Sequence, residues 1–181
     1  VYAPTGNATP DYWGAHRSPE SEKYTAALVA LDIETGEPRW HFQTVHHDVW
    51  DYDVSSQPTL VDVPIDGKTV PALVQATKRG EVFMLDRRTG KPLATVEERP
   101  VPQGPAKGDW LSKTQPFSVG MPSFDATVWT EKLMWGVTPV DQLWCRIKFR
   151  QARYEGPMTP PGTKPSITYP SYSGGVDWGS V

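Results

Sequence analysis

The sequence is poor in features that mark several common protein classes. Only one of its 181 residues, Cys145, is a cysteine, which excludes an internal disulfide framework and most thiolate metal sites. With Trp144 and Ile147 nearby, we expect Cys145 to be a small buried hydrophobe rather than a reactive thiol. No apolar stretch approaches the roughly 20 residues that cross a bilayer. The net charge of −3 is mild and the basic residues are scattered, which argues against nucleic acid as a partner.

Long runs of good helix formers are also scarce. The chain instead holds 19 Pro, 15 Gly, eight Trp, seven Tyr and five Phe, a composition that favours many short strands joined by turns. We therefore expect an all-β fold. Residues 1–5 resemble a strand that is already under way, so we interpret residues 1–181 as an internal fragment of a longer protein.

One segment of the chain is repeated. The eight residues from Leu31 to Pro38 return from Leu85 to Pro92, and Leu, Asp, Thr, Gly and Pro recur at the same places. In each copy an apolar strand, at 27–31 and 82–85, runs into an Asp-x-x-Thr-Gly turn, in which Asp bonds its own backbone and Gly supplies positive φ. A second strand is expected after each turn.

The spacing of this repeat is typical of β-propellers, whose blades of about four strands surround a central channel. The fragment then covers roughly three blades. Further strands are expected at 57–63, 71–77, 143–150 and 166–169, with Asp66-Gly67 as the turn between the first two.

Residues 97–131 are rich in Pro and Gly and weakly periodic, and we expect a long ordered loop there. Loops of this length in compact folds are usually functional, and Trp110, Phe117 and Phe124 could anchor this one. It could cap the channel of the propeller or be a decorative insertion.

The run from Val45 to Asp53 holds two His, three Asp, a Trp and a Tyr. Because unpaired Asp is rarely buried whereas Trp and Tyr bury large areas, the run fits an aromatic-walled pocket with an ionisable floor. An acidic surface loop anchored by Trp50 and Tyr52 is the structural alternative.

Taken together, these motifs resemble the pyrroloquinoline quinone (PQQ) dehydrogenases, and among them the membrane-bound quinoprotein glucose dehydrogenases. The resemblance spans essentially the whole chain. It is carried by Thr5-Gly6-Asn7, the repeat closed by Trp40, Thr44 to Asp51, Gln57 to Leu60, Lys78, Pro100 to Gly104 and Phe149 to Gly156.

The resemblance implies an eight-bladed propeller whose blades are fastened by Trp docking motifs, with PQQ and a divalent cation, Ca²⁺ or Mg²⁺, near the axis. The stretch from Ala30 to Trp40 matches that docking motif, whereas Ala94 stands at the Trp position of the second copy. The resemblance also implies oxidation of D-glucose at C1 to glucono-1,5-lactone, with ubiquinone as electron acceptor. It further implies a parent protein anchored at the periplasmic face of the inner membrane.

Two residues match the family's reaction centre. Asp51 matches the catalytic base of the family. Such a base is needed because removal of hydride from a sugar carbon requires the hydroxyl proton to leave in concert. Lys78 matches the basic residue that contacts the quinone oxygens, where positive charge stabilises a developing oxyanion. A capping Asp and a solvated Lys are the structural alternatives. Arg79 has no matching role and is expected to face solvent.

Other matches are weaker. Asn7 matches an amide that ligates the metal in alcohol-oxidising relatives, with Thr9 close enough to assist or replace it, and hard cations prefer such oxygen donors. Asp177 and Trp178 are candidate PQQ contacts. His46 and His47 are candidate substrate residues, of which at most one is expected to face the pocket because adjacent side chains on a strand diverge.

Two rival functions remain open at this point. One is a PQQ alcohol or polyol dehydrogenase of the same fold, and the other is a non-catalytic propeller that scaffolds protein partners. Under either enzymatic interpretation, residues 1–181 alone are expected to be inactive, because roughly three blades leave the ring open.

Overall fold

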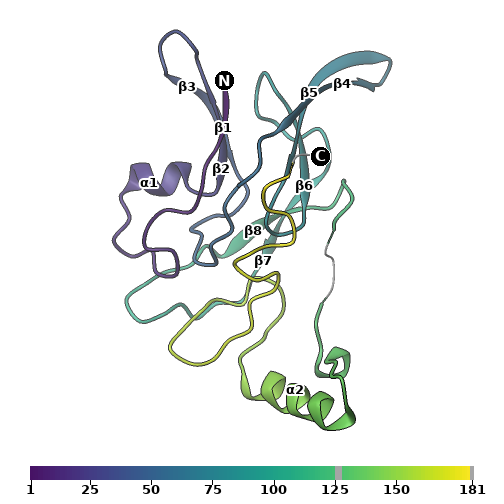
Figure 1. Cartoon of the computed structure of the whole chain (residues 1–181). Coiled ribbons are helices and arrows are strands. Elements are labelled where there is room, and N and C mark those ends of the chain that lie inside the picture. The colour runs from purple at the N-terminus through teal and green to yellow at the C-terminus, as the bar shows by residue number, and fades with distance from the viewer. Residues whose placement is uncertain (125–127, 180–181) are drawn as a thin grey trace.

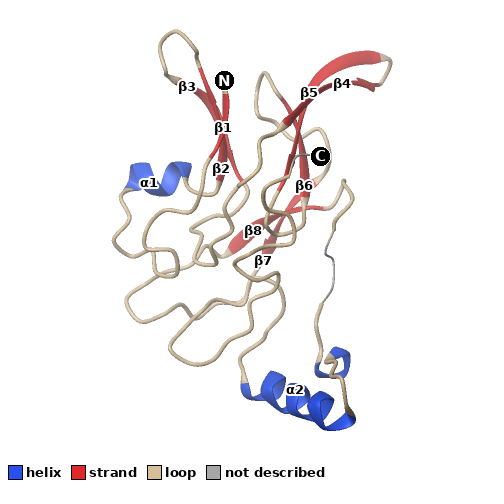
Figure 2. Ribbon diagram, viewed as in Figure 1, coloured by secondary structure: helices blue, strands red, loops and turns tan. Residues whose placement is uncertain are grey.

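The computed structural model describes residues 1–124 and 128–179 and arranges eight strands in three small antiparallel sheets (Figure 1). The first sheet has the order β1-β2-β3, the second β4-β5-β6 and the third β7-β8. Helices α1 and α2 and the short helix η1 lie outside these sheets (Figure 2). The bounds are β1 Tyr2–Pro4, α1 Pro19–Tyr24, β2 Ala27–Leu31, β3 Pro38–Gln43, β4 Thr59–Ile65, β5 Lys68–Ala76, β6 Val82–Asp86, β7 Val96–Pro100, β8 Thr114–Ser118, η1 Glu131–Leu133 and α2 Pro139–Gln151.

The repeated turn forms as the sequence predicts. In the first copy the Asp32 carboxylate accepts the N–H groups of Glu34 and Thr35, and Gly36 has a φ of +74°. In the second copy Asp86 accepts the N–H of Arg88, and Gly90 has a φ of +70°. The two copies differ beyond the turn. β2 pairs with β3 across the first turn. Across the second turn β6 forms a bridge between Leu85 and Pro92 but no paired strand, and the next strand, β7, pairs with β8.

Trp40 joins the first two sheets. Its Nε1–H donates to Arg87 O at 3.2 Å, and its ring lies so close to Gly90 that an added Cβ there would sit 2.6 Å from Cε3. The apolar cluster below this contact takes residues from both sheets. Its buried members are Leu28, Leu73, Phe83 and Leu85, with Tyr2, Trp40, Phe42 and Val96 packed around them. This is the contact between blades that the docking motif predicts.

A second cluster lies under the loop from Val45 to Asp53 and includes Trp50, Tyr52 and Met158. The Asp66-Gly67 turn between β4 and β5 is confirmed, with φ of +49° and +73°.

Residues 97–131, expected as a long loop, hold most of β7 and all of β8. These strands bring the start and middle of that stretch together.

The expected strand at 143–150 is wrong, because those residues belong to α2. The alternation of apolar and basic residues from Cys145 to Arg150 is strand-like, but the helix start is strongly specified. Thr138 accepts the N–H of Asp141 while Asp141 accepts the N–H of Thr138, a capping box, and Pro139 follows the cap. Because α2 has no buried residues, Cys145 is only half-buried rather than a core residue. The expected strand at 166–169 reduces to one parallel bridge between Arg153 and Ser166.

Candidate active site

The loop that carries Asp51 is shaped by a buried carboxylate. Asp48 is fully buried, and its two oxygens accept the N–H groups of Trp50 at 2.8 Å and Tyr52 at 2.7 Å. Burial raises the pKa of Asp48 to about 7, although these two bonds oppose the shift. Between these two bonded residues, Asp51 takes a φ of +64°.

Two aromatic side chains anchor the same loop to the C-terminal part of the chain. Trp50 donates from Nε1 to Thr159 O at 2.8 Å, and the Tyr52 hydroxyl donates to Pro170 O at 2.6 Å. Both rings are buried, which gives the loop its apolar base. The half-buried Asp51 is thereby held between two anchored neighbours, one on each side in sequence.

Lys78 lies between two carboxylates. Its Nζ is 3.7 Å from Asp51 Oδ2 and 2.6 Å from Asp53 Oδ2, and it also donates to Asp51 O at 3.1 Å. Burial and the neighbouring Asp53 raise the pKa of Asp51, while Lys78 opposes the rise. For Lys78, burial alone would lower the pKa, but Asp53, Asp51 and Asp177 together raise it. The lysine is therefore a firm positive charge beside the proposed base.

Asn7 reaches the same place from the segment that follows β1. Its backbone N–H donates to Asp53 Oδ1, its Nδ2 donates to Asp11 O at 2.9 Å, and its Oδ1 accepts from Thr25 Oγ1 at 3.3 Å. Thr9 lies on the exposed side of the same segment. The structure thus brings Asn7 to the carboxylates more directly than Thr9.

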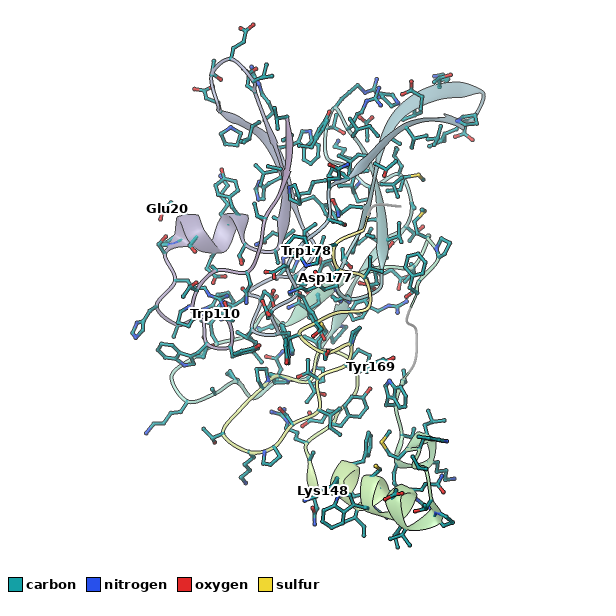
Figure 3. All side chains as sticks on the ribbon, in the orientation of Figure 1. Glu20, Trp110, Lys148, Tyr169, Asp177 and Trp178 are labelled. Carbon is teal, nitrogen blue, oxygen red and sulfur yellow. The ribbon has the colours of Figure 1, made fainter. Side chains whose placement is uncertain are left out.

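The C-terminal segment closes over Lys78. Gly175 donates its N–H to Lys78 O at 2.8 Å, and a Cβ at Gly174 would lie 2.8 Å from Lys78 Cβ. Asp177, held through Ser55 Oγ donating to its carbonyl, keeps a buried Oδ1 that has no partner within the described residues. Trp178 is 85% exposed, and it lies beside Asp177 in the C-terminal segment (Figure 3). Asp177 is close enough to influence Lys78, whereas Trp178 has no such contact and is largely exposed.

The two histidines belong to a different arrangement. His46 is half-buried, with its ring nitrogens 3.2 Å from Gln43 Oε1 and 3.1 Å from Glu98 Oε1. The His47 side chain is fully buried, with Nε2 3.0 Å from Asp109 Oδ1 and Nδ1 3.0 Å from Glu22 Oε2, the latter without hydrogen-bond alignment. Neither imidazole bonds to Asp51, Asp53 or Lys78.

Both rings instead line a shallow cleft of about 520 Å³ whose wall includes Trp110. The Trp110 ring packs against the His47 ring, with centroids 3.7 Å apart and planes inclined by 31°. Trp110 comes from the Pro- and Gly-rich stretch, so one of the aromatic residues expected to anchor that stretch packs against the loop of Asp51.

Sequence reasoning missed several residues of this site. Asp53 and Asp48 stand in the acidic run, but nothing in their order says which carboxylate pairs with Lys78 and which is buried. Arg79 was expected in solvent and is buried instead. It pairs with Glu81 at 3.0 Å, donates to Pro116 O at 2.7 Å and stacks over Phe117. These partners lie far away in sequence or across a turn, where no local signal marks them.

Comparison with known proteins places the chain in a family. Residues 1–181 match the PQQ glucose/ethanol/alcohol dehydrogenase β-propeller domain, and the chain belongs to this family of quinoprotein dehydrogenases. It is 59% identical to the glycerol dehydrogenase large subunit of Gluconobacter oxydans and 46% identical to the quinoprotein glucose dehydrogenase of Escherichia coli, with the whole chain covered in both cases. It spans 25% and 23% of their lengths, respectively.

Among solved structures, the quinohemoprotein alcohol dehydrogenase ADHIIG of Pseudomonas putida HK5 is similar over 98% of this chain and 21% of its own. The TM-score is 0.53 at 25% sequence identity. The β-propeller expectation is therefore confirmed, and the family implies PQQ and a divalent metal ion.

The residues around Lys78 fit these groups. Asn7, Asp51 and Asp53 present amide and carboxylate oxygens, the donors that hard cations prefer, and the two carboxylates crowd each other enough that Asp53 raises the pKa of Asp51. The partnerless Oδ1 of Asp177 is a further polar atom without a protein partner in the described residues. Residues 1–124 and 128–179 hold no cluster of three or more His, Cys, Asp or Glu suited to a metal.

Proposed function

We propose that this chain supplies the catalytic base and one cofactor-binding lysine of a PQQ-dependent dehydrogenase that oxidises a hydroxyl group of a polyol or sugar. The observation that supports it is the placement of Lys78 Nζ 3.7 Å from the Asp51 carboxylate, on a loop anchored through Trp50 and Tyr52. The arrangement suits chemistry in which a proton leaves a hydroxyl beside a fixed positive charge. A scaffold protein has no use for it.

In this proposal Asp51 accepts the hydroxyl proton of the substrate at a carboxylate oxygen. Lys78 holds a positive charge next to that oxygen and has one N–H left to donate toward the cofactor. PQQ, when bound, supplies the acceptor for the hydride that leaves the substrate carbon. Asn7, assisted by Thr9, is the proposed cation ligand, either Ca²⁺ or Mg²⁺, and Asp177 with Trp178 forms the proposed remaining contact to PQQ.

The histidines take a different proposed role from the one that the sequence indicated. His47 is buried between Glu22 and Asp109, so we assign it support of the Asp51 loop. His46 has a half-buried ring at the cleft beside Trp110, and of the two it stays the proposed substrate residue.

A polyol such as glycerol is the substrate class we favour, with D-glucose, oxidised at C1 to glucono-1,5-lactone, as the second candidate. Supporting the polyol, two relatives named glycerol dehydrogenase large subunit are 59% and 58% identical to this chain. Relatives named quinoprotein glucose dehydrogenase are 46–48% identical over the whole chain, and a quinate/shikimate dehydrogenase is 47% identical. These values favour the polyol without any change in the proposed base or cofactor.

For the electron acceptor we propose ubiquinone, and for the location the periplasmic face of the bacterial inner membrane. Support for a quinone comes from the relative named quinate/shikimate dehydrogenase (quinone). Among residues 1–124 and 128–179, no helix has the length and apolar character to span a membrane.

The deciding experiment uses the full-length protein loaded with PQQ and Ca²⁺ or Mg²⁺. Dye reduction is followed with glycerol, D-glucose and quinate at equal concentrations, for the wild type and for Asp51→Asn. We expect the highest kcat/KM with glycerol and a loss of at least about a hundredfold in kcat for Asp51→Asn, because a general base contributes roughly 10²–10⁴ in rate. An Asp51→Asn enzyme with wild-type kcat contradicts the assignment of the base, and the highest kcat/KM with D-glucose reverses the order of substrates.

A further inference from the structure

Lys78 has a closer partner than the proposed base. Its Nζ lies 2.6 Å from Asp53 Oδ2, whereas Asp51 Oδ2 is 3.7 Å away, beyond the reach of a hydrogen bond. The only hydrogen bond from Lys78 to Asp51 goes to the main-chain oxygen of Asp51, at 3.1 Å. The carboxylate that holds the ammonium is therefore that of Asp53.

Asp53 is itself fixed from a second direction. Its other oxygen accepts the N–H of Asn7, and Gly6 packs against it so closely that a Cβ at Gly6 would lie 2.9 Å from Asp53 Oδ1. Both oxygens of Asp53 are thus engaged, one by the segment after β1 and one by the lysine after β5. Because both of its oxygens are held, the Asp53 carboxylate fixes the direction in which the Lys78 ammonium points. A mobile surface carboxylate could not do so.

The two neighbouring carboxylates, Asp53 and Asp51, make different contacts with Lys78. An ammonium has three N–H donors, and in Lys78 two of them go to Asp53 Oδ2 and Asp51 O, which leaves one for a ligand. The side chain of Asp51 makes no hydrogen bond to the lysine. Burial, and after it the close neighbour Asp53, raise the pKa of Asp51, which favours uptake of a proton there.

We propose that Asp53 is the positioning residue of the site, which orients the Lys78 ammonium toward the cofactor and leaves the Asp51 carboxylate available. The inference rests on the proposed function of Lys78 and assigns to Asp53 a role that acts through that lysine. It follows that the effect of losing Asp53 on cofactor binding should vanish when Lys78 is already absent.

A double-mutant cycle on the full-length apoprotein tests this. PQQ binding is followed by quenching of protein fluorescence at saturating Ca²⁺, for the wild type, Asp53→Asn, Lys78→Gln and the double variant. Loss of a hydrogen bond to a charged group costs enough to weaken PQQ binding roughly tenfold or more for each single variant. In the Lys78→Gln background we expect Asp53→Asn to change the affinity less than about twofold, because coupled residues are not additive.

Two further variants sharpen the test. Asp53→Glu keeps the charge and should retain PQQ affinity closer to the wild type than Asp53→Asn does. Asp62→Asn removes an aspartate whose ion pair with Arg87, at 3.0 Å, lies on the exposed part of β4, and should leave PQQ affinity unchanged. If Asp53→Asn yields no folded protein, Asp53→Ser, which keeps an acceptor for the N–H of Asn7, replaces it in the cycle.

Additive losses in the cycle overturn the inference, because Asp53 would then act independently of Lys78. The inference is also overturned if Asp53→Asn weakens Ca²⁺ binding but leaves PQQ affinity intact at saturating Ca²⁺, since Asp53 would then be a cation ligand only. A Lys78→Gln protein with wild-type PQQ affinity refutes the proposed function of the lysine itself. The failure of the two proposals is thus distinguishable.

Discussion

The imidazole of His47 and the carboxylate of Asp109 meet across 62 residues of sequence, with Nε2 3.0 Å from Oδ1. His47 has a φ of +45°, an unfavourable conformation for a residue with a side chain, and directly precedes the buried Asp48. Asp109 also accepts the N–H of Gly14 at 2.8 Å. One carboxylate therefore ties the Pro- and Gly-rich stretch both to the segment before α1 and to the start of the Asp51 loop.

Asp109→Ala should destabilise the protein and disturb the site. It removes the acceptor of a buried imidazole and of a buried amide, each of which costs about 1–3 kcal/mol when left unsatisfied. We expect a lower free energy of unfolding, measured by urea denaturation of the full-length protein, together with weaker PQQ binding. The matched control is Glu98→Ala, whose contact with the half-buried His46 should be worth less than about 1 kcal/mol. If Asp109→Ala and Glu98→Ala lowered the free energy of unfolding equally, the Asp109 contacts would be worth no more than that of Glu98.

The two copies of the repeated turn offer a test of the contact between blades. Gly36 and Gly90 share a positive φ, but a Cβ at Gly36 would meet nothing within 4 Å, whereas one at Gly90 would lie 2.6 Å from the ring of Trp40. Gly36→Ala should cost about 1–2 kcal/mol for the backbone alone. Gly90→Ala should cost more, because the Trp40 ring must also move. Urea denaturation of the full-length protein measures both, and a cost for Gly36→Ala that matches that of Gly90→Ala would mean that Trp40 docking adds little.

Much of the fold was predictable because its signals are local. The turns at Asp32 and Asp86 and the hairpin at Asp66-Gly67 need particular backbone conformations that few residues supply, so a short stretch of sequence specifies them. The error at α2 has the same origin. An alternating pattern favours a strand, but the capping box at Thr138 and Asp141 specifies a helix start, and the helix start prevails.

The candidate site was predictable only in part. Asp51, Lys78 and Asn7 were expected from resemblance, and the structure brings them together through the contacts of Asp53. Asp53 itself had no expected role, because a choice between two carboxylates two residues apart depends on the direction of each side chain. The burial of His47 and Arg79 depends on partners at Asp109 and Pro116, which only the folded chain places beside them.

The close approach of the C-terminal segment to Lys78 leads to another prediction. A Cβ at Gly174 would lie 2.8 Å from both Cβ and Cγ of Lys78 and 3.0 Å from its Cα. Gly174→Ala should therefore displace the lysine and weaken PQQ binding, followed by fluorescence quenching in the full-length protein.

Gly156→Ala is the matched control for Gly174→Ala. Gly156 also has positive φ but no atom within 4 Å of an added Cβ, so its variant carries the backbone cost without the collision with Lys78. We expect Gly156→Ala to lower stability and leave PQQ affinity near the wild-type value. Equal PQQ affinities for the two variants would show that the contact at Lys78 has no influence on the cofactor.

The buried Asp48 predicts a pH dependence of stability. Burial raises its pKa from 3.8 to about 7, so between these values the folded protein binds a proton that the unfolded chain has released. The free energy of unfolding should therefore fall as the pH rises through this window, by at most about 1.4 kcal/mol per pH unit from this group.

Asp48→Asn isolates this contribution. Asn resembles the protonated carboxyl and does not titrate, so the variant lacks the fall that Asp48 causes. Asn keeps only one oxygen acceptor for the N–H groups of Trp50 and Tyr52, which lowers its stability at every pH. The stability difference between the wild type and Asp48→Asn should be largest near pH 4 and shrink toward pH 8, as urea denaturation across that range measures. A constant difference would mean that the carboxylate stays ionised in the fold, stabilised by its two N–H donors more than burial opposes it.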